Sequence, residues 1–206
     1  MKILLISAGT KKEGATERAL YETECALKKE SVSYDIFRLF TNSVATCQGC
    51  GACAKSGICI HNDEASRLIE ITKGYDGYIF FTPVHYGGAS GTLKSALARL
   101  FFSSKKELEY KPAAAIAASR RGGNVTALEE ITRFFSFASM PIISGNYPGI
   151  IHGTTYDEAG RDLEGLQTLR SIVDNMVWLI RCINKGKSVG INHPTPEIKI
   201  KTNYIK

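Results

Sequence analysis

The sequence predicts an α/β protein built as a three-layer α/β/α sandwich around a five-stranded parallel sheet of order 2-1-3-4-5. Short apolar runs alternate with longer amphipathic stretches along the whole chain. This alternation is typical of parallel βαβ units joined by right-handed crossovers. The chain has 206 residues, of which 44% are hydrophobic, and this suits one domain with its own core. Five strands in this arrangement favour a doubly wound sheet.

The N-terminal part of the chain contains two strands and two helices by this pattern. Lys2–Ser7 (KILLIS) is predicted to be a buried strand, and Thr16–Lys29 a helix. Val32–Leu39 is predicted to be the second strand. Asn62 or Asp63 can cap a helix that runs to about residue 73, because both side chains accept bonds from free N–H groups.

The C-terminal part continues the alternation. The strands predicted here are Gly77–Thr82, which is apolar enough to be buried on both faces, Pro112–Ser119 and Pro141–Ser144. The helices predicted are one capped by Ser90 that runs through LKSALARLFF, then Val125–Ala138 and about Leu163–Asn184. We therefore expect one domain over residues 1–190. The polar, proline-containing segment 191–206 is expected to be an extended C-terminal arm, packed across a subunit boundary.

Composition and charge limit the partners. The net charge is +6, but the basic residues are spread along the chain without a stripe of interleaved aromatics. Single-stranded nucleic acid binding requires such a stripe, so we expect no nucleic acid partner. The segment MKILLIS has only four consecutive apolar residues, and no apolar stretch approaches a membrane span. We expect a cytoplasmic protein without a membrane partner.

Three loops that follow predicted strands carry residues suited to a flat, phosphate-bearing ligand. The first is Ala8–Thr16 (AGTKKEGAT), where glycines, a hydroxyl and lysines precede a helix, whose free N–H groups favour an anion. The second is Thr82–Gly88 (TPVHYGG), and the third is Ser119–Asn124 (SRRGGN). Ligands of such sheets bind beyond the carboxyl ends of the strands, so we expect the three loops to form one site.

Four of the six cysteines lie within thirteen residues, CQGCGACAKSGIC, as Cys47, Cys50, Cys53 and Cys59. Glycines between them allow tight turns, and compact runs of four thiolates commonly hold iron–sulfur clusters. Two other interpretations stay open: reduced thiols without a metal, and a zinc site, which more often uses two separate cysteine pairs. We expect Cys25 and Cys182 to be small buried residues in helices.

These motifs together resemble the flavodoxin-like family of NADPH-dependent FMN reductases, and within it the iron–sulfur flavoproteins. The resemblance covers nearly the whole chain. It rests on the loop after the first strand, the cysteine loop, the segment FTPVHYGGASGTLKSALAR, the Gly122–Gly123 pair and the stretch DLEGLQTLR. It implies a flavodoxin-like fold, bound FMN, and a homodimer or homotetramer. It also implies a [4Fe–4S] cluster on the four cysteines, close to a neighbouring subunit's flavin.

The resemblance also implies roles for individual residues. Those expected around the FMN phosphate are Gly9, Thr10, Lys11, Gly14, Ala15 and Thr16. Those expected along the isoalloxazine ring are Pro83, Val84, His85, Tyr86 and Gly87, with His85 and Tyr86 as the catalytic candidates. Ser119, Gly122 and Gly123 are expected to close the pocket. Lys94 and Arg99 match a family helix and are expected to be structural, and His61 is expected to be a surface or capping residue.

The chain departs from the family pattern at two places. The phosphate loop of the family usually reads GSPRxxGNT, so Gly9, Lys11 and Ala15 replace a serine, an arginine and an asparagine. Lysine supplies charge without the bidentate geometry of arginine. The family tyrosine after Pro-Val is His85 here, with Tyr86 one place later.

Two classes of function follow from these features. The first is an FMN-dependent oxidoreductase or electron-transfer flavoprotein. Its electron donor or acceptor is a small molecule or a ferredoxin-like protein, and it either passes electrons between a cluster and FMN or acts as an NAD(P)H-dependent FMN or quinone reductase with a metal-free cysteine loop. The second is a non-catalytic thiol or zinc redox sensor.

Overall fold

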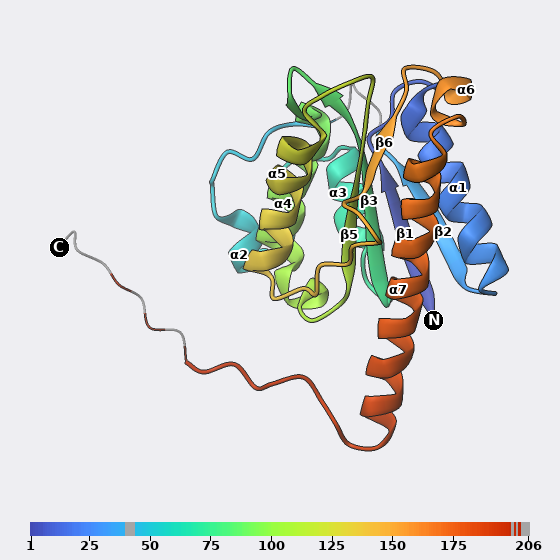
Figure 1. Cartoon of the computed structure of the whole chain (residues 1–206). Coiled ribbons are helices and arrows are strands. Elements are labelled where there is room, and N and C mark those ends of the chain that lie inside the picture. Colours follow the sequence, from blue (N-terminus) through green and yellow to red (C-terminus); the bar gives the residue numbers. More distant parts are fainter. Residues whose placement is uncertain (40–43, 199, 201, 203–206) are drawn as a thin grey trace.

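The computed structural model describes residues 1–39, 44–198, 200 and 202, and it contains the expected sheet (Figure 1). The order of hydrogen-bonded strands is β2-β1-β3-β5-β6, and all neighbours on this path are parallel. These strands are β1 (Lys2–Ser7), β2 (Ser33–Arg38), β3 (Gly77–His85), β5 (Ala113–Ser119) and β6 (Ile150–His152). A further two-residue strand, β4 (Gly88–Ala89), pairs antiparallel with the end of β3 and lies off this path. The predicted order is therefore confirmed.

Helices cover both faces of the sheet, which gives the three layers (Figure 1). One face carries α1 (Ala15–Lys29), α6 (Tyr156–Ala159) and α7 (Leu163–Ser188). The other carries α3 (Glu64–Ile71), α4 (Gly91–Leu108) and α5 (Asn124–Phe137). The short α2 (Ala52–Ser56) lies beside α4. As expected, Asp63 and Ser90 cap α3 and α4 with their side chains.

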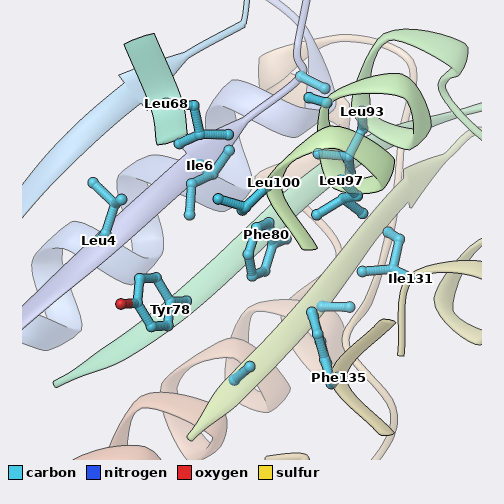
Figure 2. Close-up of a cluster of buried hydrophobic side chains, with 14 of the residues drawn as sticks. Leu4, Ile6, Leu68, Tyr78, Phe80, Leu93, Leu97, Leu100, Ile131 and Phe135 are labelled. Atoms are coloured by element: carbon cyan, nitrogen blue, oxygen red, sulfur yellow. The ribbon is translucent and has the colours of Figure 1, made fainter. Parts of the chain in front are cut away.

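Alternating side chains of the strands feed two cores, one on each face of the sheet. On β3, Tyr78 and Phe80 belong to the core under α3, α4 and α5 (Figure 2). Their neighbours Ile79 and Phe81 belong to the core under α1 and α7. All four are fully buried, so the prediction that this strand is buried on both faces is confirmed. This arrangement also explains why β3 lies at the centre of the sheet.

The fifth strand was predicted at the wrong place. The predicted segment Pro141–Ser144 forms only an isolated bridge to β5, between Ile142 and Ala113. The chain then leaves the sheet and returns at Gly149, where an added Cβ would lie 2.2 Å from the carbonyl oxygen of Ala115. Only a glycine fits so close to the neighbouring backbone, and the continuous pairing with β5 is made by β6 after this residue.

The two isolated cysteines are exposed rather than buried, which corrects a second expectation. Cys25 lies on the outer face of α1, and Cys182 lies on α7 beyond its last fully buried residue, Ile180. Beyond α7, residues 191–198 have no regular secondary structure and are exposed, and the division at residue 190 stays a prediction. None of the described helices combines the length and apolar character needed to cross a membrane.

Candidate functional site

A cleft of about 280 Å³ lies beyond the carboxyl ends of β1, β3, β5 and β6. It brings together residues from the first two predicted loops and Ser119 and Arg120 of the third. The residues that line it are Gly9, Thr10, Lys11, Gly14, Ala15, Thr16, Pro83, Val84, His85, Ala118, Ser119, Arg120, Gly153 and Thr154. All six residues expected around a phosphate are among them. Tyr86, Gly87, Gly122 and Gly123 are not.

The loop after β1 leads the chain into the N-terminus of α1. The N-cap residue is Gly14, and among the described residues no side chain caps the first N–H groups of this helix. Gly14 donates its N–H to the carbonyl of Lys11, which closes the turn, at 3.2 Å. An uncapped helix N-terminus favours an anion, because its N–H groups and its dipole both point at the ligand. The cleft is therefore suited to a phosphate at this end.

The loop after β6 forms part of the cleft that the sequence did not indicate. Gly14 and Thr155 form an antiparallel bridge, and Tyr156 donates its N–H to the carbonyl of Glu13 at 2.8 Å. These bonds hold Gly153 and Thr154 against the loop after β1. The prediction of the fifth strand at Pro141–Ser144 did not include these residues. They reach the carboxyl edge of the sheet because they directly follow the strand at Ile150–His152. Correct placement of that strand would have identified them.

The segment expected along a flavin ring forms a β-hairpin with a two-residue turn. Val84 and His85 pair with the two residues of β4, and the turn consists of Tyr86 and Gly87, both with positive φ (46° and 83°). A turn with two such residues matches the twist of the paired strands. His85 lines the cleft, whereas the side chain of Tyr86 is fully exposed at the tip. Only His85 of the two catalytic candidates therefore lies in the cleft.

The carboxylate of Glu130 fixes this hairpin from behind. It accepts the N–H of Ala89 at 2.7 Å and an N–H of Lys94 at 3.3 Å. Burial acts to raise the pKa of Glu130, but these two bonds outweigh it and hold the pKa below its usual value. The expected structural role of Lys94 agrees with this contact.

The loop after β5 supports the hairpin from the side. Gly123 has φ 89°, and a Cβ added to it would lie 2.7 Å from the Cα of Gly87. Gly123 thus packs directly against the hairpin, although it does not line the cleft. The Ser119 hydroxyl lies in the cleft and donates to the side-chain oxygen of Asn124 at 2.5 Å. Asn124 in turn donates to the carbonyl of Ala117, so the loop is held to its own strand.

A second cavity, of about 120 Å³, is lined by all four clustered cysteines and by Gln48, Gly49, Gly51, Ala54, Ile60, His61, Arg99 and Phe102. Cys53 lies on α2, and the other three cysteines lie in the loops on either side of it. Gly49, Gly51 and Gly57 have φ near 70°, so the expected tight turns at glycine are confirmed. The cavity shares no lining residue with the cleft.

The guanidinium of Arg99, whose side chain is 1% exposed, closes the cysteine loop at both ends. It donates Nε–H to the sulfur of Cys59 at 3.3 Å and Nη1–H to the carbonyl of Ala45 at 3.3 Å. The same Nη1 contacts the carboxylate of Asp63 at 2.5 Å, and that carboxylate accepts the N–H of Ala45 at 2.8 Å. Burial opposes the charge of Asp63, but the bonds from Arg99 and Ala45 lower the pKa of its carboxyl.

His61 also belongs to this cavity. Its Nε2 is buried and has no hydrogen-bond partner among the described residues. Asp63 rather than His61 caps α3, so the capping role is not seen, and the half-buried His61 lines the cysteine cavity. Within the described part of the chain, no three His, Cys, Asp or Glu side chains lie close enough together to hold a metal ion.

Comparison with known proteins places the chain in a family. The model of the NADPH-dependent FMN reductase family matches residues 1–155, which include the cleft and the cysteine loop. The chain belongs to this family. It is a flavin-dependent oxidoreductase, and FMN is its flavin.

Two curated relatives match the chain over about nine tenths of its length. An iron-sulfur flavoprotein of Methanocaldococcus jannaschii is 28% identical over 193 residues, which cover 90% of this chain and 100% of the relative. An iron-sulfur flavoprotein of Methanosarcina thermophila is 25% identical over 191 residues, which cover 91% and 99%.

Solved structures confirm the flavodoxin-like fold. RosB, with a bound 8-demethyl-8-formylriboflavin-5'-phosphate intermediate, has a TM-score of 0.69 at 14% identity and covers 100% of this chain and 94% of its own. The NAD(P)H:acceptor oxidoreductase FerB from Paracoccus denitrificans has a TM-score of 0.64 at 15% identity, with 88% and 97% covered.

Proposed function

We propose that this protein transfers electrons between a [4Fe–4S] cluster on Cys47, Cys50, Cys53 and Cys59 and FMN in the cleft at the carboxyl edge of the sheet. The observation that carries the proposal is that one short chain segment lines a single small cavity with four thiols, on a fold that binds FMN elsewhere. The names of the curated relatives, which are iron-sulfur flavoproteins, support it.

The residues of the cleft fit FMN. The phosphate would lie at the uncapped N-terminus of α1, with Gly9, Thr10, Gly14, Ala15 and Thr16 around it and the Lys11 ammonium as the counter-charge. Gly9 suits this position, because a Cβ there would lie 3.1 Å from Cβ of Thr16 and crowd the loop. Backbone N–H groups of this loop would thus take over some of the phosphate hydrogen bonds that the serine, arginine and asparagine side chains of the family pattern make.

The ring would lie along the hairpin strand at Pro83, Val84 and His85, with Ser119 on the far side. Gly87, Gly122 and Gly123 belong to the loops that shape this wall. FMN supplies the redox chemistry, and the protein positions it and sets its environment. His85 is the side chain placed to bind or orient a second substrate at the ring. Tyr86, which is fully exposed at the hairpin tip, is the second candidate for contact with a substrate.

The cysteine cavity fits a cluster by its donors and its apolar surroundings. Thiolates are the usual ligands of such clusters, and Ile60 and Phe102 supply apolar walls. Glycines at Gly49, Gly51 and Gly57 leave open space around the loop, so the thiols are free to converge.

Iron analysis with cysteine variants tests the proposal. Protein purified without oxygen should contain FMN, with about four iron and four sulfide per chain. In Cys50→Ser/Cys53→Ser, iron should be lost and FMN retained. The matched control is Cys25→Ser/Cys182→Ser, which changes two exposed cysteines outside the cavity and should keep both. Iron that survives the first double variant, or wild-type protein without iron, would contradict the cluster.

One observation favours an alternative. No three of the potential ligands are at metal-binding distance in the described residues, as expected for an NAD(P)H-dependent FMN or quinone reductase with a metal-free cysteine loop. This alternative predicts FMN without iron and reduction of the flavin by NAD(P)H alone. In the cluster-based proposal the donor is a ferredoxin-like protein or a small molecule. In keeping with the family resemblance, we also propose that electrons cross between chains of a homodimer or homotetramer in the cytoplasm.

A further inference from the structure

Two side-chain nitrogens of residues that line the cysteine cavity are suited to donate hydrogen bonds to sulfur. One is the Nε–H of Arg99, which already donates to the sulfur of Cys59 at 3.3 Å. The other is Nε2 of His61, which is buried beside the thiols and has no partner among the described residues. Buried polar atoms are nearly always hydrogen-bonded, so an orphaned one next to a cavity points to a missing partner.

The two groups belong to one network. Nη2 of Arg99 donates to the hydroxyl of Ser66 at 2.7 Å, and that hydroxyl donates to the carbonyl of His61. Asp63 pairs with the same guanidinium at 2.5 Å and caps α3. The side chain of Arg99 and the backbone of His61 are therefore held in place by the folded protein itself.

We propose that Arg99 and His61 are positioning residues of the cysteine site, whose N–H groups donate to sulfur atoms of the bound cluster and raise its reduction potential. The inference rests on the proposed function. Hydrogen bonds to the sulfurs are among the factors that set the potential of such clusters. They favour the more negative, reduced state, because an N–H dipole stabilises added negative charge.

The step that these residues influence is a one-electron reduction. One electron passes from the ferredoxin-like or small-molecule donor to the site, the donor is oxidised by one electron, and no bond forms or breaks. Arg99 brings no uncompensated charge, because its carboxylate partner Asp63 neutralises it. Its effect therefore comes from the direction of the Nε–H bond, which a lysine would not reproduce.

The test compares His61→Phe with a matched control, His193→Phe, which changes an exposed histidine outside the cavity. Phenylalanine keeps a ring of similar size and removes both nitrogens. Iron, sulfide and FMN contents are measured first, and the cluster potential is then determined by anaerobic redox titration followed by EPR. We expect His61→Phe to keep its iron and to be harder to reduce by about tenfold in the equilibrium constant, or about 59 mV for one electron. His193→Phe should match the wild type.

Arg99→Lys provides a second, independent measurement. It keeps the charge but loses the Nε–H donor, and we expect a shift in the same direction. If Arg99→Lys does not fold, the cluster potential of His61→Phe still tests the inference. A wild-type potential in His61→Phe, a more positive one, or an equal shift in the control would overturn the inference. Loss of iron from His61→Phe would also overturn it, because His61 would then be a ligand. Iron-free wild-type protein would refute the proposed function itself, which distinguishes the two failures.

Discussion

Replacement of Gly123 by alanine should destabilise the protein and weaken its FMN binding. Gly123 has φ 89°, and its position touches the tip of the β3–β4 hairpin, where a new Cβ would lie 2.7 Å from Cα of Gly87 and 2.8 Å from Cγ1 of Val84. Neither distance is compatible with a real carbon contact. The hairpin, which forms one wall of the cleft through Val84 and His85, must therefore move.

The expected cost has two parts. An alanine in the left-handed region loses about 1–2 kcal/mol relative to its preferred backbone conformation. Forcing a methyl group into a packed contact typically costs about 1–3 kcal/mol more. We therefore expect Gly123→Ala to lose about 3 kcal/mol of unfolding free energy, with a weaker affinity for FMN because Val84 and His85 are displaced.

The neighbouring residue provides the control. Gly122 has no positive φ, and apart from its chain neighbours no described residue lies within 4 Å of its added Cβ, so Gly122→Ala should change the stability by less than about 0.5 kcal/mol. Urea unfolding measures the free energies, and quenching of flavin fluorescence measures FMN affinity. Equal stability of the two variants would refute the packing argument. A destabilised Gly123→Ala with unchanged FMN affinity would refute the role of the hairpin in the cleft.

Three further predictions follow from single contacts. Lys11→Ala should weaken FMN binding by about tenfold, as expected for one charge-assisted hydrogen bond, while Lys11→Arg should retain or improve it; flavin titration measures both. Glu130→Ala should cost about 1–2 kcal/mol in urea unfolding, because the N–H of Ala89 loses its acceptor. Glu22 pairs with Arg18 of its own helix, α1, and with Arg170 of α7, and although burial opposes its charge, the bonds from these arginines lower its pKa. Its contribution, about 1 kcal/mol, is present above the unfolded-state pKa and is lost as the pH falls through the lower folded pKa. Glu22→Gln should therefore be less stable than the wild type at pH 7, with the difference vanishing in acid; a constant difference would contradict the assignment.

Much of the fold could be predicted from the local pattern of apolar residues. The fifth strand is the exception, and it shows what this pattern lacks. The strands Gly77–Thr82 and Pro112–Ser119 were predictable because burial on both faces leaves an uninterrupted apolar run. Pro141–Ser144 has the same appearance, but it makes only one bridge to the sheet. The true pairing begins after Gly149, and it depends on the close approach to Ala115, which is a long-range contact that no local pattern contains.

The candidate site shows the same division. The loop after β1 was predictable because glycines, a hydroxyl and lysines before a helix have a direct physical meaning. Gly153 and Thr154 were not, since they reach the cleft only through the bridge between Thr155 and Gly14. His61 was predicted to be peripheral for a similar reason. It lines the cysteine cavity together with Arg99 of α4, whereas the sequence shows only that it lies two places after Cys59.

The visible absorption spectrum of protein purified anaerobically, recorded before and after reduction, tests the central claim most directly. The account predicts structured flavin bands on a broad shoulder, both of which bleach on reduction. Flavin bands alone would agree with a flavin-dependent oxidoreductase and would contradict a cluster in the cysteine cavity. A colourless protein that does not take up added FMN would contradict the account.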